Sequence, residues 1–286
     1  MIVFLDNRLV PAAEAALAIE DGALRFGDSL FETLLAKEGR IHFLEQHLDR
    51  IEHSAALLAF PCDRAAARAA LELCAATLAA PVTRLRLTLT RGAYPGLHLP
   101  PATRPGRLLV SAAPYTPPTL AERAAGVDCV LAPNQRVNPL SHLPQMKRGN
   151  YADCLYAADH ARRQGAREAL FCDPKGNLLE GASSNLFAIL DSTLITPPAG
   201  ELVLPGILRQ QVLLAADHLG LPRRETALQR NQLPEATEVF LSNSLIGLLP
   251  VARLGNITLQ RGRTWQALLA AVDVSAEKCC NPRISS

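Results

Sequence analysis

Apolar and polar residues recur along this chain in two periods, which predict both strands and helices. Arg84 to Thr90 alternates with a period of two, so a half-buried strand is expected there. From Leu44 to Leu58 the apolar residues recur at helical spacing, which predicts a helix with one apolar face. A second helix is predicted over residues 63–78, with Asp63 as its N-cap.

The rest of the chain continues this mixture. Asp6-Asn7 predicts a hairpin turn that leads into Leu9-Val10. Further strands are predicted at residues 2–5, 29–36, 107–113, 127–131, 168–172, 186–190, 238–242 and 248–254, and further helices at 150–164, 206–219 and 265–272. The fold class expected from this order is mixed α/β, without internal repeats.

Consecutive prolines after Tyr115 mark the strongest candidate linker, because proline stops both a helix and a central strand. The length of 286 residues suits two domains or one large one. We therefore expect a small α/β domain over 1–117, a linker over 118–124 and a large α/β domain over 125–286.

Composition narrows the class of protein. The chain is 49% hydrophobic and 20% charged with a net charge of +2, which is ordinary for a globular protein and argues against a nucleic-acid partner. Seven scattered cysteines without metal-ligand spacing predict free thiols in a reducing cytosol and no metal site. With neither a signal peptide nor an apolar run of about 18 residues, a cytoplasmic protein without a membrane span is expected.

The most informative residues are a lysine and a glutamate. Lys147 ends an irregular segment just before a predicted helix, and Glu180 lies between two predicted strands. A lysine that forms a Schiff base and a carboxylate that keeps a pyridine nitrogen protonated are the minimal groups for pyridoxal phosphate (PLP) chemistry. Asn185 is expected to orient the region around Glu180 through hydrogen bonds.

A dianionic phosphate also needs an anchor, and three kinds of group are candidates. Arg50 offers a guanidinium on a predicted helix. The backbone amides of Ile207 and Leu208 begin another helix, where unpaired N–H groups attract anions. The hydroxyls of Ser242 and Ser244 are the third candidates.

Six segments together resemble one family, the class IV aminotransferases. These fold-type IV PLP enzymes include branched-chain aminotransferase, D-amino acid aminotransferase and aminodeoxychorismate lyase. The segments appear in family order: RFGDSLFETL (25–34), HLDRI (47–51), QMKRGNY (145–151), EGASSN (180–185), LPGILRQ (204–210) and FLSNSLIGLLPV (240–251).

The resemblance implies a role for each matching position. Lys147 matches the Schiff-base lysine, and Glu180 matches the partner of the pyridine nitrogen. Tyr151 matches a tyrosine that hydrogen-bonds the phenolic oxygen of the cofactor in branched-chain enzymes. The positions implied to bind the phosphate are Arg50, Ile207, Leu208 and Ser244. The resemblance also implies a two-domain fold with PLP between the domains, working as a homodimer whose sites borrow residues from the partner.

The branch of the family is decided by fewer residues. The start FGDSLFET and the turn Asn243-Ser244-Leu245 look more like aminodeoxychorismate lyase, which releases pyruvate and 4-aminobenzoate for folate synthesis. Tyr151 and the short loop after Arg91 depart from that branch. Candidate substrate contacts in this loop are Arg91, Tyr94 and His98.

Two alternatives to the lyase remain open at this point. The first is an aminotransferase of branched-chain or D-amino acids. In that enzyme Lys147 would move a proton from the amine-bearing carbon of the substrate to the aldehyde carbon of the cofactor. The second is a catalytically silent protein that binds PLP, against which the intact pair Lys147 and Glu180 argues.

Overall fold

A computed structural model describes residues 1–5 and 7–280, and these form two compact units. The division is not contiguous along the chain, whereas the sequence suggested contiguous domains. Among the described residues, unit 1 comprises those within 1–116, 146–151 and 276–280, and unit 2 comprises 117–145 and 152–275. The short segment 146–151, which carries Lys147, therefore belongs to unit 1 although the chain on both sides of it belongs to unit 2.

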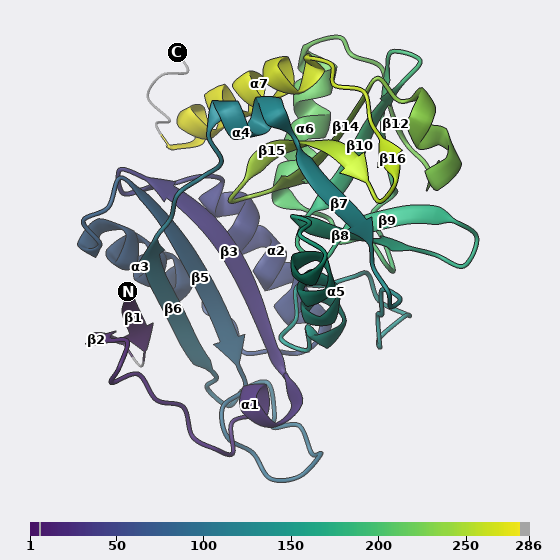
Figure 1. Ribbon diagram of the computed structural model, residues 1–286. Coiled ribbons are helices and arrows are strands. Elements are labelled where there is room, and N and C mark those ends of the chain that lie inside the picture. The colour runs from purple at the N-terminus through teal and green to yellow at the C-terminus, as the bar shows by residue number, and fades with distance from the viewer. Residues whose placement is uncertain (6, 281–286) are drawn as a thin grey trace. The chain divides into compact units, whose positions relative to one another are not determined.

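Unit 1 contains an antiparallel sheet with two helices on one face (Figure 1). The strand order is β2-β1-β6-β5-β3-β4. The strands are β1 (Ile2–Leu5), β2 (Arg8–Pro11), β3 (Ser29–Lys37), β4 (Arg40–Ile41), β5 (Val82–Thr90) and β6 (Arg107–Pro114). The helices are α1 (Gly22–Phe26), α2 (Leu44–Leu57) and α3 (Arg64–Thr77), of which α2 and α3 cover the sheet.

The period-two and helical patterns explain this layer. Leu85 and Leu87 alternate with arginines on β5, so one face of the strand is fully buried against the helices. Leu48 and Leu71 supply the matching apolar faces of α2 and α3. As the sequence predicted, the side chain of Asp63 caps α3, by accepting a hydrogen bond from the Ala66 N–H at 2.9 Å.

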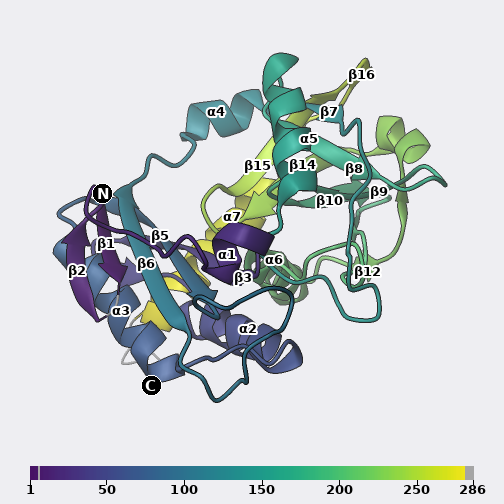
Figure 2. The same cartoon turned by 90° about the horizontal axis from the view of Figure 1, so that it is seen from below.

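Unit 2 is built around a larger sheet with helices beside it (Figure 2). Its strands are β7 (Val127–Leu131), β8 (Glu168–Cys172), β9 (Asn177–Gly181), β10 (Asn185–Leu190), β11 (Thr193–Thr196), β12 (Arg223–Glu225), β13 (Leu228–Gln229), β14 (Glu238–Asn243), β15 (Gly247–Leu254) and β16 (Ile257–Thr258). Its helices are α4 (Leu120–Ala125), α5 (Ala152–Arg163), α6 (Ile207–His218), most of α7 (Thr264–Cys280) and the 3-10 turn η1 (Arg230–Glu235).

Strand pairing in unit 2 closes a ring. The order β10-β14-β15-β7-β8-β9 returns to its start because β9 also pairs with β10, at the position where Glu180 faces Asn185. Strands of this ring contribute a common apolar core that includes Leu170, Leu186 and Leu241. Two residues singled out in the sequence thus lie where the ring closes.

The predicted strands and helices are confirmed apart from their ends, but several elements were not expected. The segment 118–124, predicted to be a linker, contains helix α4, because Thr119 and Glu122 form a capping box and the preceding prolines lie outside the helix. Helix α7 is longer than the predicted 265–272. The short elements α1, β4, β9, β11, β12, β13, β16 and η1 carried too little pattern to be predicted, so Glu180, which was expected between two strands, lies on strand β9. Part of the predicted turn, Asp6, lies outside the described residues.

No helix within residues 1–5 and 7–280 is both long enough and apolar enough to cross a bilayer.

The core of unit 1 gives a direct test of this packing. Leu34 on β3 is fully buried, so Leu34→Ala should lower the free energy of unfolding by roughly 2–5 kcal/mol, since it leaves a cavity. Leu57→Ala, at a side chain that is 38% exposed on α2, is the control and should change it by less than about 0.5 kcal/mol. Urea unfolding followed by circular dichroism measures both, and equal effects would contradict the assignment of the core.

Candidate functional site

The backbone around Lys147 is fixed by pairing with the start of β3. The Phe31 N–H donates to the Lys147 carbonyl at 2.9 Å, and the Gly149 N–H donates to the Ser29 carbonyl at 2.8 Å. A Cβ at Gly149 would lie 2.9 Å from the backbone carbonyl oxygen of Gly27, so only glycine allows this approach. The lysine therefore extends from a rigid edge of the unit 1 sheet.

The Lys147 side chain lies among aromatic rings. Its Nζ is 4.4 Å from the ring centroid of Phe31 and 5.6 Å from that of Tyr151. These two rings meet edge to face, with centroids 5.6 Å apart. The guanidinium of Arg86 lies 3.7 Å from the Phe31 ring, so two cations share one aromatic side chain.

A buried carboxylate on β3 organises the other polar group of unit 1. Glu32 accepts hydrogen bonds from Arg50 Nε at 2.7 Å and from Arg50 Nη2 at 2.5 Å. His47 Nδ1 lies 2.7 Å from the second oxygen of the same carboxylate. Glu32 and His47 are each 1% exposed, so the carboxylate of Glu32 fixes the direction of the Arg50 fork.

The ionisation of this group follows from its surroundings. Burial alone would raise the pKa of Glu32, but the charge of Arg50 and the hydrogen bond from His47 hold it at about 2. Burial lowers the pKa of His47, and its contact with Glu32 opposes this only in part. At neutral pH the imidazole is therefore uncharged and donates from Nδ1, since the ionised carboxylate can only accept.

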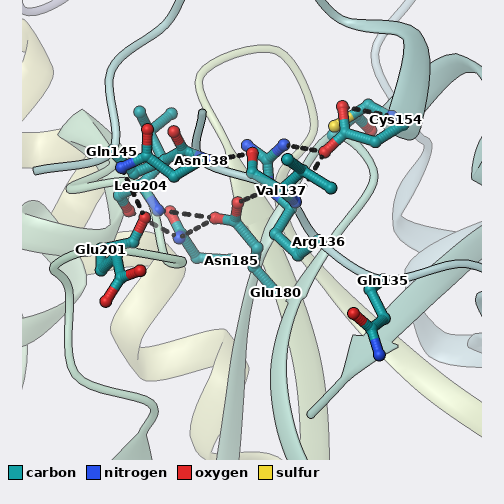
Figure 3. A network of polar contacts seen from close by, with 12 residues as sticks. Gln135, Arg136, Val137, Asn138, Gln145, Cys154, Glu180, Asn185, Glu201 and Leu204 are labelled. Atoms are coloured by element: carbon teal, nitrogen blue, oxygen red, sulfur yellow. Dashed lines mark hydrogen bonds and ion pairs between the residues drawn. The ribbon is translucent and has the colours of Figure 1, made fainter. Parts of the chain in front are cut away.

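In unit 2, Glu180 is the centre of a second polar network (Figure 3). Its Oε1 accepts from Arg136 Nε at 2.8 Å, and its Oε2 accepts from the Leu204 N–H at 2.8 Å. Arg136 also donates from Nη1 to Asp153 at 2.6 Å. Burial alone would lower the pKa of Arg136, but Glu180 and Asp153 raise it above its ordinary value.

Asn185 links Glu180 to the start of helix α6. Its Nδ2 donates to the Leu204 carbonyl at 2.9 Å and to Glu180 Oε2 at 3.4 Å. Gly206, the N-cap of α6, passes so close that a Cβ there would lie 2.0 Å from Asn185 Oδ1. Through these contacts, Asn185 holds the turn before α6 against β10, which is consistent with the orienting role expected for it.

The turn between Glu180 and Asn185 is held by another buried carboxylate. Glu168 accepts hydrogen bonds from Ser183 Oγ at 2.7 Å and from Ser184 Oγ at 3.0 Å. Burial raises the pKa of Glu168. These bonds keep the two strands in the register that sets Glu180 opposite Asn185.

The start of α6 has the character of an anion site. No side chain caps this helix and its first turn holds no acid, so its backbone N–H groups point outward with a partial positive charge. Ser242 pairs with Asn185 across the strands, and its fully buried hydroxyl has no hydrogen-bond partner among the described residues. A buried hydroxyl without a partner is costly unless it binds something else.

The three predicted substrate contacts have different surroundings. Arg91 is buried, stacks 3.8 Å from the Phe60 ring and donates to Asp28 and to the carbonyls of Leu58 and Ala59.

Tyr94 donates its hydroxyl to Asp28 at 2.8 Å, and burial, together with this carboxylate, raises its pKa to about 12. His98 is exposed. The substrate role of these residues stays a prediction, while the contacts give Arg91 and Tyr94 a second task, which is to hold their loop.

No group of three or more metal-ligating side chains occurs in the part of the chain that the structure describes.

The fold is that of solved fold-type IV enzymes, and together with the family match it defines this chain as a PLP-dependent enzyme. Residues 29–254 match the family Amino-transferase class IV, and the chain belongs to this family.

Three similar proteins illustrate its range. A branched-chain-amino-acid aminotransferase of Escherichia coli (strain K12) is 28% identical over 278 residues, which cover 91% of this chain and 87% of the relative. The crystal structure of 4-amino-4-deoxychorismate lyase from Pseudomonas aeruginosa is 29% identical with a TM-score of 0.83, and the match covers 95% of this chain and 98% of the lyase. A hypothetical aminotransferase from Mycobacterium tuberculosis, in its PLP-bound form, is 26% identical with a TM-score of 0.84, covering 96% and 99% of the two chains.

The cofactor of this family is PLP, and the residues present fit it. The orphan hydroxyl of Ser242 and the uncapped start of α6 supply neutral donors for a phosphate, and the buried carboxylate of Glu180 supplies an acceptor for a ring N–H. The predicted cofactor residues are divided between the two units. Those in unit 1 are Lys147, Tyr151 and Arg50. Those in unit 2 are Glu180, Asn185, Ile207, Leu208 and Ser244.

Several residues of these networks were not assigned a role from the sequence. Glu32 and His47 lie inside the segments that carry the family resemblance, so that signal was available. Arg136 and Asp153 lie outside those segments, in an irregular stretch and on a helix where charged residues are common. For these two, only the fold reveals their contact with Glu180.

The buried ion pair between Glu32 and Arg50 in unit 1 should make the free energy of unfolding depend on pH. Because the pKa of Glu32 is lowered from 4.5 to about 2, its contribution is fully present above pH 4.5 and is lost as the pH falls toward 2. At pH 7, Glu32→Gln should lower the free energy of unfolding by roughly 3 kcal/mol, and this difference should shrink below pH 4.5.

Urea titrations at pH 7, 5, 4 and 3 measure the difference. Glu52→Gln is the control, because this exposed carboxylate on α2 pairs with Arg64 at the surface and should matter by less than about 1 kcal/mol throughout. A difference between wild type and Glu32→Gln that stays constant from pH 7 to pH 3 would show that the charge of Glu32 is not stabilised.

Ser242 gives a test of the phosphate site. Ser242→Ala removes a hydroxyl that has no protein partner, so the free energy of unfolding without cofactor should change by less than about 0.5 kcal/mol. The dissociation constant for PLP should rise about tenfold or more, since a hydrogen bond to a charged group is lost. Equilibrium dialysis measures it, and Ser275→Ala, whose hydroxyl contacts Gln211, is the control. An unchanged affinity in Ser242→Ala would exclude this hydroxyl from the site.

Proposed function

We propose that this enzyme is a PLP-dependent 4-amino-4-deoxychorismate lyase, which converts its substrate to pyruvate and 4-aminobenzoate. The observation that carries the proposal is the set of side chains around Lys147. The ring of Phe31 lies beside the Lys147 Nζ, and Arg86 adds a guanidinium on that ring, whereas Tyr151 is the residue that matches the branched-chain enzymes. A flat, anionic cyclohexadiene ring suits such a place better than a small aliphatic side chain does.

The similarity to the Pseudomonas aeruginosa lyase, which extends over 98% of that chain, supports the same choice. The turn Asn243-Ser244-Leu245, which resembles the lyase branch, is held by Asn243. Its Oδ1 accepts from the Leu245 and Ile246 N–H groups at 2.9 Å, and its Nδ2 donates to the Ser183 carbonyl at 3.0 Å.

The reaction assigns two tasks to Lys147. When bound, the cofactor supplies an electron-withdrawing ring that accepts the electrons of the carbon–hydrogen bond at the amine-bearing carbon. The Nζ of Lys147, displaced by the substrate amine, takes this proton as a general base. The bond between the substrate's six-membered ring and its enolpyruvyl oxygen then breaks. Lys147 returns the proton to the methylene carbon of the departing enolpyruvyl group, which completes pyruvate. Reactant and products therefore balance without water or an oxidant.

The remaining residues bind and orient. Glu180 would accept the ring N–H of the cofactor, and Arg50 with the amides of Ile207 and Leu208 would hold its phosphate. We also propose that the enzyme is a cytoplasmic homodimer whose partner contributes residues to the site.

An aminotransferase is the second candidate, and the 28% identity to the Escherichia coli branched-chain enzyme favours it. Lys147 would move the same proton to the aldehyde carbon of the cofactor instead of to a leaving group. Glu180 and Arg50 would keep their tasks. Products rather than site residues therefore separate the two activities.

Product analysis decides between them. Wild-type enzyme given 4-amino-4-deoxychorismate should form pyruvate and 4-aminobenzoate in equal amounts, while L-leucine or D-alanine with 2-oxoglutarate should yield almost no new amino acid. Lys147→Ala should lower turnover by roughly 10²–10⁴-fold, since it removes the general base. Chromatography of both products measures this.

Lys175→Ala, at an exposed turn, is the matched control and should leave turnover unchanged. Fast glutamate formation from L-leucine or D-alanine without 4-aminobenzoate would replace the lyase by the aminotransferase. If neither reaction were measurable and Lys147→Ala matched wild type, the protein would be a silent PLP-binding protein.

A further inference from the structure

The Glu180 network contains a charged residue that the proposed function does not use. Arg136 is 6% exposed, and its guanidinium lies between two carboxylates. Nε donates to Glu180 at 2.8 Å, and Nη1 donates to Asp153 at 2.6 Å. Figure 3 shows Arg136 directed at Glu180 from the irregular segment after β7. One buried cation is therefore shared by two acids.

Together, these three residues carry one more negative charge than positive charge. A buried Arg136–Glu180 pair alone would be neutral, and it would offer a cationic ring little more than a dipole. With Asp153 ionised, the group of three carries a net charge of −1. A bound, protonated pyridine nitrogen would bring this group to neutrality, which a poorly hydrated site favours.

Asp153 is well placed to keep its charge. It lies in the first turn of α5, where the helix end favours an anion. Its Oδ2 accepts from the Val137 N–H at 3.1 Å and its Oδ1 from its neighbour's N–H, that of Cys154, at 2.9 Å. Burial alone would raise the pKa of Asp153, but Arg136 and these donors hold it below its ordinary value.

We propose that Asp153 is a positioning residue that acts through Arg136 to leave the Glu180 carboxylate negative enough to hold a protonated cofactor nitrogen. By sharing Arg136, it prevents that arginine from neutralising Glu180. The titratable groups that act most strongly on Arg136 are Glu180, Asp153 and the thiol of Cys154. The inference rests on the assignment of Glu180 to the ring nitrogen in the proposed function, and it holds for either the lyase or the aminotransferase.

The test compares variants of the holoenzyme loaded with PLP labelled with ¹⁵N in the ring. In wild type, the ¹⁵N chemical shift should be that of a protonated pyridine at neutral pH. Asp153→Asn keeps the shape and an acceptor oxygen but removes the charge, so the shift should move toward the unprotonated value. The dissociation constant for PLP should rise about tenfold. Asp153→Glu restores the charge and should recover both values.

Two further variants separate the possible failures. Asp159→Asn removes an acid from the same helix that pairs with Arg162 and Arg163 at the surface, and it should behave as wild type. Glu180→Gln should move the ¹⁵N shift at least as far as Asp153→Asn. If Asp153→Asn does not fold, Asp153→Ser replaces it, because a hydroxyl also accepts N–H bonds.

These variants distinguish a failure of the Glu180 assignment from a failure of the proposed role of Asp153. A wild-type ¹⁵N shift in Glu180→Gln would overturn the cofactor assignment itself. A moved shift in Glu180→Gln together with a wild-type shift in Asp153→Asn would overturn the role of Asp153 and leave that assignment standing. Loss of PLP affinity in Asp153→Asn without a moved shift would also overturn it, because a purely structural role gives that pattern.

Discussion

The carboxylate of Glu180 is the point at which separate segments of unit 2 are joined. Arg136 reaches it from the segment after β7, Asn185 from β10, and the Leu204 N–H from the turn before α6. A carboxylate with 4% of its residue surface exposed is tolerated only when its charge is matched by donors in good geometry. The need to satisfy this one charge therefore constrains three segments together, at the place where the ring of strands closes.

Unit 1 solves a similar problem with Glu32. Its buried carboxylate holds the Arg50 guanidinium by two hydrogen bonds and orders the neutral imidazole of His47. In both units, a buried carboxylate fixes the direction of an arginine guanidinium. Groups held in this way need little reorganisation when a charged ligand arrives, which is the basis of electrostatic preorganisation.

Much of this fold follows from periodicity. The patterns of α2, α3 and β5 predict these elements because each buries one face against a single neighbouring layer. Helix α4 was missed because the prolines before it dominated, although the Thr119–Glu122 capping box was present in the sequence. Lys147 and Glu180 were singled out because a lysine and a carboxylate suit PLP chemistry and because their segments resemble a family. Arg136 and Asp153 could not be found, since nothing in their local sequence indicates that tertiary structure brings them to one buried acid.

The way the chain passes between the two units has a practical consequence. Residues 146–151 belong to unit 1 while 117–145 and 152–275 belong to unit 2, so the polypeptide passes from one unit to the other repeatedly instead of once. A chimaera that exchanges everything before residue 117 with another family member would separate the lysine-bearing hexapeptide from the strand that aligns its backbone. Recombination between relatives should therefore transfer the first 116 residues and this hexapeptide as one heritable block.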